Sequence, residues 1–153
     1  MSVYRFDSAW HLPGPVDRAW EAVTRVEDWP SWWPAVSATE ELAPGAADGT
    51  GRVVRYLLRA PLGYRLAVTT RVVEVVPPHL VVVRVTGNLD GTGRWSLVPE
   101  GGGVRLHQLW EVSTTRPWMR LLAPLARPAF RWSHDRAARR GGEGLVRWLE
   151  GRR

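Results

Sequence analysis

Apolar and polar residues alternate along most of this chain, as they do in strands that bury one face. In residues 2–10, Tyr4, Phe6 and Trp10 share one face, while charged side chains occupy the other. Between residues 36 and 115, glycine- and proline-rich turns separate six further apolar runs. These runs are VSATEEL, GRVVRYLLRA, YRLAVTTRVVEVV, HLVVVRV, GRWSLVPE and GVRLHQLWEVSTT. They predict an antiparallel meander of six strands in addition to the first strand.

Two of these runs indicate which face of the sheet is buried. The apolar face of the last run carries Val104, Leu106, Gln108, Trp110 and Val112. The run that starts at residue 64 divides in the same way, with Tyr64, Leu66 and Val68 on its apolar face. A sheet with one apolar face needs a second layer of structure to cover it.

Helical spacing occurs in two other parts of the chain. Pro15 suits a first helical turn, and Val16, Ala19, Trp20 and Val23 recur at steps of three and four, which predicts a helix over about residues 15–25. The segment VEDWPSWWPAV follows, with three tryptophans in five residues, and its prolines allow at most one helical turn between them. From residue 116 onward the period of two is lost. A stripe from residue 121 to residue 148 predicts a long helix instead.

The predicted long helix contains four residues that disfavour regular helix. Pro124 and Pro128 are expected to kink or divide it early. Gly141 and Gly142 are expected to loosen it later. We therefore predict a long and imperfect C-terminal helix.

Several motifs occur in the order that these elements predict. They are PVDRAW at residues 15–20, the WP and WWP pairs of the tryptophan turn, GNLDGTG at 87–93, FRWSHD at 130–135 and GEGL at 142–145. With the element order, they resemble the START-like (SRPBCC, birch-pollen-allergen-like) superfamily, and in particular its bacterial polyketide cyclase/dehydrase-like branch. The resemblance spans nearly the whole chain.

The resemblance implies an α+β helix-grip fold. In this fold a curved antiparallel sheet of about seven strands wraps around a long C-terminal helix, with two short helices after strand 1, and the gap between sheet and helix is a cavity. The tryptophan turn would close one end of the grip. The resemblance implies no single activity, because similar proteins include lipid carriers, ligand-gated regulators and aromatase/cyclases.

Composition narrows the class of protein. With 153 residues, of which 44% are hydrophobic, the chain is long enough for one domain over residues 1–153. It has no cysteine, which excludes disulfides and thiolate metal sites. It has no run of 18 apolar residues and no signal-peptide pattern at its start, so we expect a cytoplasmic protein without a transmembrane segment.

The net charge of +6 raises the question of nucleic-acid binding. All 21 basic residues are arginines, and they are spread along the chain with local density only near the C-terminus. A nucleic-acid-binding protein usually gathers its basic residues on one element or interleaves them with stacking aromatic residues. We therefore expect no specific nucleic-acid partner.

Few residues suggest catalysis. The four histidines show no metal-binding spacing, so we expect no metal and no cofactor. His134 alone is predicted to face inward, where it would serve as hydrogen-bonded structure or as a proton-transfer group. Tyr56 and Tyr64 are the candidate phenols beside it. Gln108 interrupts an apolar face, so its amide is expected to bond a neighbour, a trapped water or a ligand.

Three functional hypotheses remain open. In the first, the protein is a monomer or homodimer that binds a hydrophobic small molecule, such as a lipid, a polyketide or an aromatic metabolite. In the second, the same cavity belongs to a polyketide aromatase/cyclase in which His134 and Tyr56 or Tyr64 move protons. In the third, side chains fill the cavity and the domain is a partner-binding or stress-related module. The predicted ligand-binding residues are Trp33, Tyr64, Leu66, Val68, Trp95, Leu106, Gln108, Trp110, Phe130 and His134.

Overall fold

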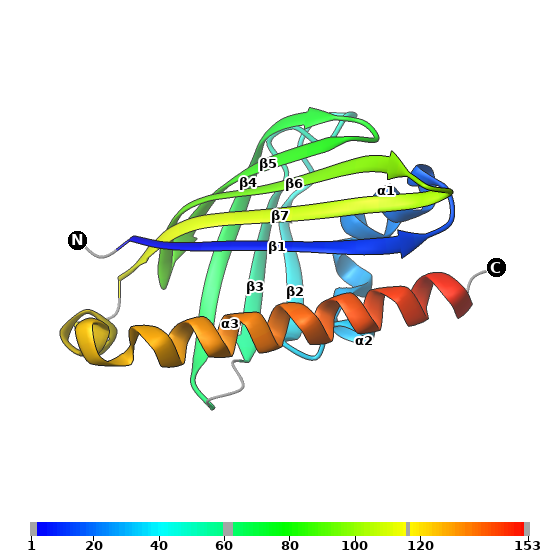
Figure 1. The fold of residues 1–153 in the computed structure, drawn as a ribbon. Coiled ribbons are helices and arrows are strands. Elements are labelled where there is room, and N and C mark those ends of the chain that lie inside the picture. Colours follow the sequence, from blue (N-terminus) through cyan, green and yellow to red (C-terminus); the bar gives the residue numbers. More distant parts are fainter. Residues whose placement is uncertain (1–2, 60–62, 116, 152–153) are drawn as a thin grey trace.

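A seven-stranded antiparallel sheet curves around one long helix (Figure 1). The structure is a computed structural model that describes residues 3–59, 63–115 and 117–151. The strands are β1 (Val3–Pro13), β2 (Val36–Ala43), β3 (Val53–Arg59), β4 (Arg65–Val76), β5 (Leu80–Gly87), β6 (Leu89–Glu100) and β7 (Gly103–Thr114). Their order across the sheet is β1-β7-β6-β5-β4-β3-β2. The predicted meander and the helix-grip fold are therefore confirmed.

Strands β2 to β7 pair with their neighbours in sequence, and β1 completes the sheet by pairing with β7. The register places Trp10 of β1 opposite Leu106, and Trp95 of β6 opposite Gln108. Gly91 of β6 lies so close to β7 that a β-carbon would overlap the carbonyl oxygen of Glu111. The segment GNLDGTG is a turn only at its start, because β6 already begins at Leu89.

Three short helices connect β1 to β2. They are α1 (Val16–Thr24), the 3-10 helix η1 (Val26–Asp28) and α2 (Trp29–Trp32). Helix α2 is the single turn that the prolines were expected to allow. The Trp33 backbone N–H donates to the Trp29 carbonyl over 2.7 Å at its end, and Pro34 cannot continue the helix.

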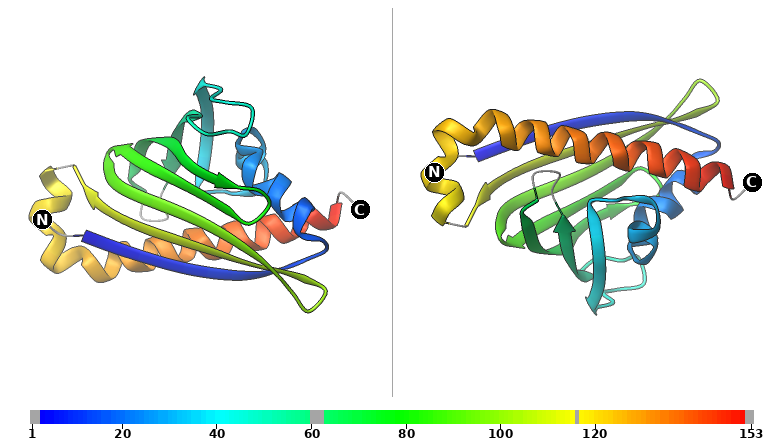
Figure 2. Two further views of the ribbon diagram at one scale, coloured as in Figure 1. Left: turned by 90° about the horizontal axis from the view of Figure 1, so that it is seen from above. Right: turned by 90° about the horizontal axis from the view of Figure 1, so that it is seen from below.

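The long helix α3 (Pro117–Gly151) covers the concave side of the sheet (Figure 1). Its first turns run in a different direction from the rest (Figure 2). They contain Pro124, and Pro128 follows shortly after, which is where proline was expected to bend the helix. No described helix combines the length and apolar character needed to cross a membrane.

The glycines of α3 do not loosen the helix, so that expectation was wrong. The helix is continuous through Gly141, Gly142 and Gly144. A β-carbon at Gly144 would overlap the carbonyl oxygen of Trp32, and one at Gly142 would overlap the ring of Trp10. These three glycines, which we call the glycine notch, let α2 and β1 approach the helix backbone directly.

The core fills one end of the space between the sheet and α3. Leu12, Leu97, Val104 and Leu106 on the sheet are fully buried, and Leu145 and Leu149 of α3 belong to the same core. Beyond this packed end, the space between the layers opens into a cavity.

Candidate functional site

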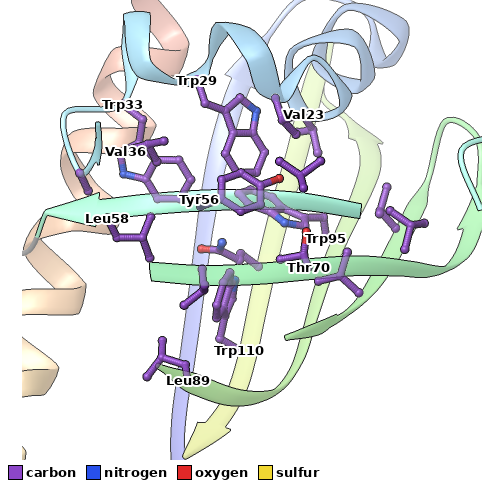
Figure 3. Close-up of a pocket in the computed structure, with 18 of the residues that line it drawn as sticks. Val23, Trp29, Trp33, Val36, Tyr56, Leu58, Thr70, Leu89, Trp95 and Trp110 are labelled. Atoms are coloured by element: carbon purple, nitrogen blue, oxygen red, sulfur yellow. The ribbon is translucent and has the colours of Figure 1, made fainter. Parts of the chain in front are cut away.

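A cavity of about 570 Å³ lies between the concave face of the sheet and α3 (Figure 3). Its walls come from all seven strands and all three α-helices. Most of the lining residues are aliphatic or aromatic, and a few polar side chains stand among them. Ligand pockets in proteins have this general composition.

Tryptophan and tyrosine rings form one wall of the cavity. The Trp29 ring centroid lies 5.5 Å from Trp33, 5.5 Å from Trp95 and 5.4 Å from Tyr56. The Trp29 indole N–H donates to the carbonyl of Ala22 in α1 over 3.1 Å, which fixes this ring in place. Trp32 is buried but does not line the cavity. The tryptophan turn therefore supplies two wall residues and one core residue.

Trp33 connects the tryptophan turn to α3. Its indole N–H donates to the backbone carbonyl of Ala137 over 2.9 Å. A β-carbon at Gly141 would collide with the same indole, so the glycine notch creates the space that Trp33 occupies. Trp33 therefore closes the cavity at the contact between α2 and α3.

Two polar side chains of β7 point toward the cavity without satisfying their hydrogen-bonding atoms. Gln108 is only 2% exposed, and its Oε1 has no partner among the described residues. The indole Nε1 of Trp110 is likewise buried with no acceptor in the described part of the chain. Each buried unpartnered group of this kind costs about 1–3 kcal/mol.

Tyr64 and His134 lie in another part of the wall. The Tyr64 hydroxyl is 3.5 Å from the Ser133 hydroxyl, and burial raises the pKa of Tyr64. The His134 ring stacks on Phe6 with centroids 3.9 Å apart. Burial lowers the pKa of His134 to about 4, and the nearby carboxylate of Asp135 only partly opposes this shift. His134 is therefore neutral at pH 7.

Tyr56 is a weak candidate for proton transfer. Burial raises the pKa of its phenol, and a hydrogen bond with Thr70 only partly offsets that rise. A phenol with a raised pKa gives up its proton less readily. Tyr56 lies in the aromatic wall against Trp29 (Figure 3).

An ionic cluster at the cavity wall joins three elements. Arg52 donates to the Thr24 carbonyl over 2.9 Å and pairs with Glu41 over 2.7 Å and with Glu27 over 3.4 Å. The guanidinium of Arg52, which directly precedes β3, thus ties together β2, α1 and η1. Within the described residues, no three histidine, aspartate or glutamate side chains gather as metal ligands.

The structure brings most of the predicted site residues to one cavity. Those that line it are Trp33, Tyr64, Leu66, Val68, Trp95, Gln108, Trp110 and His134. Leu106 does not, because it lies in the packed end between Trp10 and Leu97, so its placement in the cavity was wrong. The side chain of Phe130 lies outside the described residues.

Sequence reasoning missed several wall residues. Phe6 shares an inward face with Tyr4, and Thr70 shares one with Leu66 and Val68. Alternation along their strands could have identified both. Trp20 was placed only on the apolar stripe of the first predicted helix, and it also lines the cavity. Its sequence spacing is the same for either role.

A model of the protein family described as polyketide cyclase/dehydrase and lipid transport matches residues 4–146. No curated protein matches the chain. The Zhui aromatase/cyclase from Streptomyces sp. R1128 superposes with a TM-score of 0.80 at 17% identity, covering 99% of this chain and 96% of that one. A START superfamily protein from Mycobacterium smegmatis gives a TM-score of 0.77 at 16% identity, covering 97% and 99%. At these identities the likeness shows a common fold.

Proposed function

This chain belongs to the polyketide cyclase/dehydrase and lipid transport family, and we propose that it binds a hydrophobic small molecule in the cavity between the sheet and α3. A lipid, a polyketide or an aromatic metabolite would suit the cavity. The observation that carries the proposal is a volume of about 570 Å³ with mostly apolar and aromatic walls. This volume falls within the range of small-molecule sites. A hydrophobic ligand there would make van der Waals contacts with the apolar wall.

A second candidate is an aromatase/cyclase that uses the same cavity. It is favoured by the grouping of Tyr64 and Ser133, with His134 next to Ser133 on α3. A neutral imidazole accepts a proton, but a pKa of about 4 makes His134 a weak base at pH 7. The Tyr56 phenol is hydrogen-bonded to Thr70 instead. Binding without turnover is therefore our first proposal, and cyclisation is the second.

The third hypothesis, a packed partner-binding module, needs side chains to fill the space between sheet and helix. The cavity volume argues against it.

Native mass spectrometry of the purified protein tests the proposal directly. We expect a bound species of low mass that is released on denaturation, extracts into organic solvent and can be identified there. Incubation of the protein with that compound then separates the first two candidates. A new product whose formation is lost in His134→Ala would favour the cyclase. A protein that takes up neither a cellular compound nor any added apolar probe would contradict both.

A further inference from the structure

Gln108 and Trp110 occupy successive inward positions of β7. They are two residues apart on one face, so their β-carbons are about 7 Å apart along the strand. Both line the cavity, and one buried atom of each has no partner among the described side chains: the amide Oε1 of Gln108 and the indole Nε1 of Trp110.

The neighbouring strands do not explain these two polar groups. Trp110 lies opposite Gly93 of β6 and Phe6 of β1, neither of which has a side-chain acceptor. Gln108 lies opposite Trp95 of β6 and Ser8 of β1, and among the described residues its Oε1 accepts no hydrogen bond from either. Leucine and phenylalanine would fill similar space without leaving buried polar atoms unpaired, and they would avoid the associated cost in stability. The polar atoms therefore indicate a bound group.

The two unpaired atoms are of opposite type. An indole N–H only donates a hydrogen bond, and an amide oxygen only accepts one. A hydroxyl group satisfies both, because its oxygen accepts from Trp110 while its O–H donates to Gln108. A ketone or an ether accepts but has no proton to donate, and an alkyl group does neither.

The rest of the wall describes the remainder of the ligand. The Trp29 ring packs against Tyr56 and Trp95, with centroids 5.4 and 5.5 Å apart, and this aromatic wall favours a planar apolar body lying against it. The charged lining residues offer no free buried charge: Asp48 and Arg59 are exposed, and Arg52 is paired with Glu27 and Glu41. A carboxylate would therefore find no buried cation to pair with among the described lining residues.

We infer that the ligand is a neutral, planar aromatic alcohol or phenol whose hydroxyl group bridges the Trp110 indole N–H and the Gln108 amide oxygen. This inference rests on the proposed function and makes Gln108 and Trp110 its specificity-determining residues.

Three probes of similar shape test the inference. They are 2-naphthol, which donates and accepts; 2-methoxynaphthalene, which only accepts; and 2-methylnaphthalene, which does neither. Titration calorimetry at pH 7 with the full chain should show that 2-naphthol binds about tenfold more tightly than 2-methoxynaphthalene and about a hundredfold more tightly than 2-methylnaphthalene, about tenfold for each hydrogen bond.

Two variants locate the preference. Gln108→Leu should reduce the affinity for 2-naphthol to that for 2-methoxynaphthalene, while 2-methylnaphthalene binds as before. Trp110→Phe should instead remove the advantage of 2-methoxynaphthalene over 2-methylnaphthalene, because the ether oxygen loses its donor, while 2-naphthol keeps its hydrogen bond to Gln108. Trp132→Phe is the matched control, because Trp132 is 48% exposed and lies outside the cavity lining, and it should leave all three affinities unchanged. Retained binding of 2-methylnaphthalene shows that a variant is folded, and either variant suffices if the other does not fold.

The outcomes separate this inference from the proposed function. If the three probes bind with equal affinity, if Gln108→Leu keeps the preference for 2-naphthol over 2-methoxynaphthalene, or if Trp110→Phe keeps the preference for 2-methoxynaphthalene over 2-methylnaphthalene, the inference is overturned while hydrophobic ligand binding stands. If none of the probes binds to the wild-type protein, the proposed function fails and the inference fails with it.

Discussion

Two stretches of α3 face the same curved sheet, but one borders a cavity and the other is tightly packed. From Ser133 to Ala138, the inward residues of the helix border the cavity. From Gly141 to Leu149, the helix touches α2 and β1 so closely that the glycine notch has no room for β-carbons. Both stretches carry small inward residues. Small residues on α3 thus border a cavity where no large side chain packs against them, and they allow tight packing where tryptophans do.

The sheet shows the same contrast along β7. Leu106 is fully buried between Trp10 and Leu97, whereas Trp110 lies opposite Gly93, which has no side chain to fill the space. Inward apolar residues on one strand therefore belong to a packed core at one end and to a cavity wall at the other. The distinction depends on what the neighbouring strand and helix supply.

The largest expected effect is the difference in stability loss between truncating Leu106 in the core and truncating Leu66 in the cavity wall. Leu106→Ala should lower the free energy of unfolding by about 2–5 kcal/mol, because it opens a void in close-packed surroundings. Leu66→Ala should cost only about 1 kcal/mol, because it enlarges a space that already exists. Urea denaturation of both variants measures the difference.

Ligand uptake should show the reverse order for these two variants. Leu66→Ala should change the affinity for 2-methylnaphthalene, and Leu106→Ala should leave it nearly unchanged under conditions where the variant is folded. Equal stability losses would mean that the space beside Leu66 is as well packed as the core.

A smaller effect is expected in the glycine notch. Helix propensity alone predicts that Gly144→Ala stabilises the protein by up to about 1 kcal/mol. We expect a loss of about 3 kcal/mol instead, because the new methyl group must push the Trp32 backbone away from α3. Glu143→Ala is the adjacent exposed control and should change the free energy of unfolding by less than about 0.5 kcal/mol. A more stable Gly144→Ala protein would show that the contact is looser than the structure has it.

The sequence predicted the fold well because the fold depends on periodicity. Apolar runs between glycine- and proline-rich turns located every strand of the meander, and the prolines around Trp32 correctly limited α2 to one turn. The cavity wall was harder to predict, as Leu106 and Trp110 share one strand face but differ in what lies opposite. The role of Gly141, Gly142 and Gly144 depends on tryptophans more than 100 residues away, which local spacing does not reveal.

The pH dependence of stability should report the burial of His134. Its pKa is about 6.5 in an unfolded chain and about 4 in the folded protein, so the unfolded state binds more protons between these values. Stability should therefore fall as the pH drops from 6.5 to 4, by a His134 contribution on the order of 2 kcal/mol, since this side chain is 24% exposed. His134→Phe keeps a ring stacked on Phe6 but cannot titrate, so it should lose this part of the slope. Urea denaturation at pH 7 and pH 4.5 measures this part. If the wild type and His134→Phe lost the same free energy of unfolding between these pH values, the histidine would be solvated.

The smallest expected effect is at Trp33, where the packed and hollow stretches of α3 meet. Trp33→Phe removes the hydrogen bond to Ala137 but leaves that carbonyl within the helix, so we expect a loss of only about 0.5–1.5 kcal/mol. Trp20, Trp29, Trp95 and Trp110 also line the cavity, so the change in tryptophan emission on ligand binding should shrink in this variant without disappearing. The exposed Trp132→Phe control should keep the full change. If Trp33→Phe also kept it, Trp33 would belong to the packed side of the boundary, and the cavity would end before it reached the tryptophan turn.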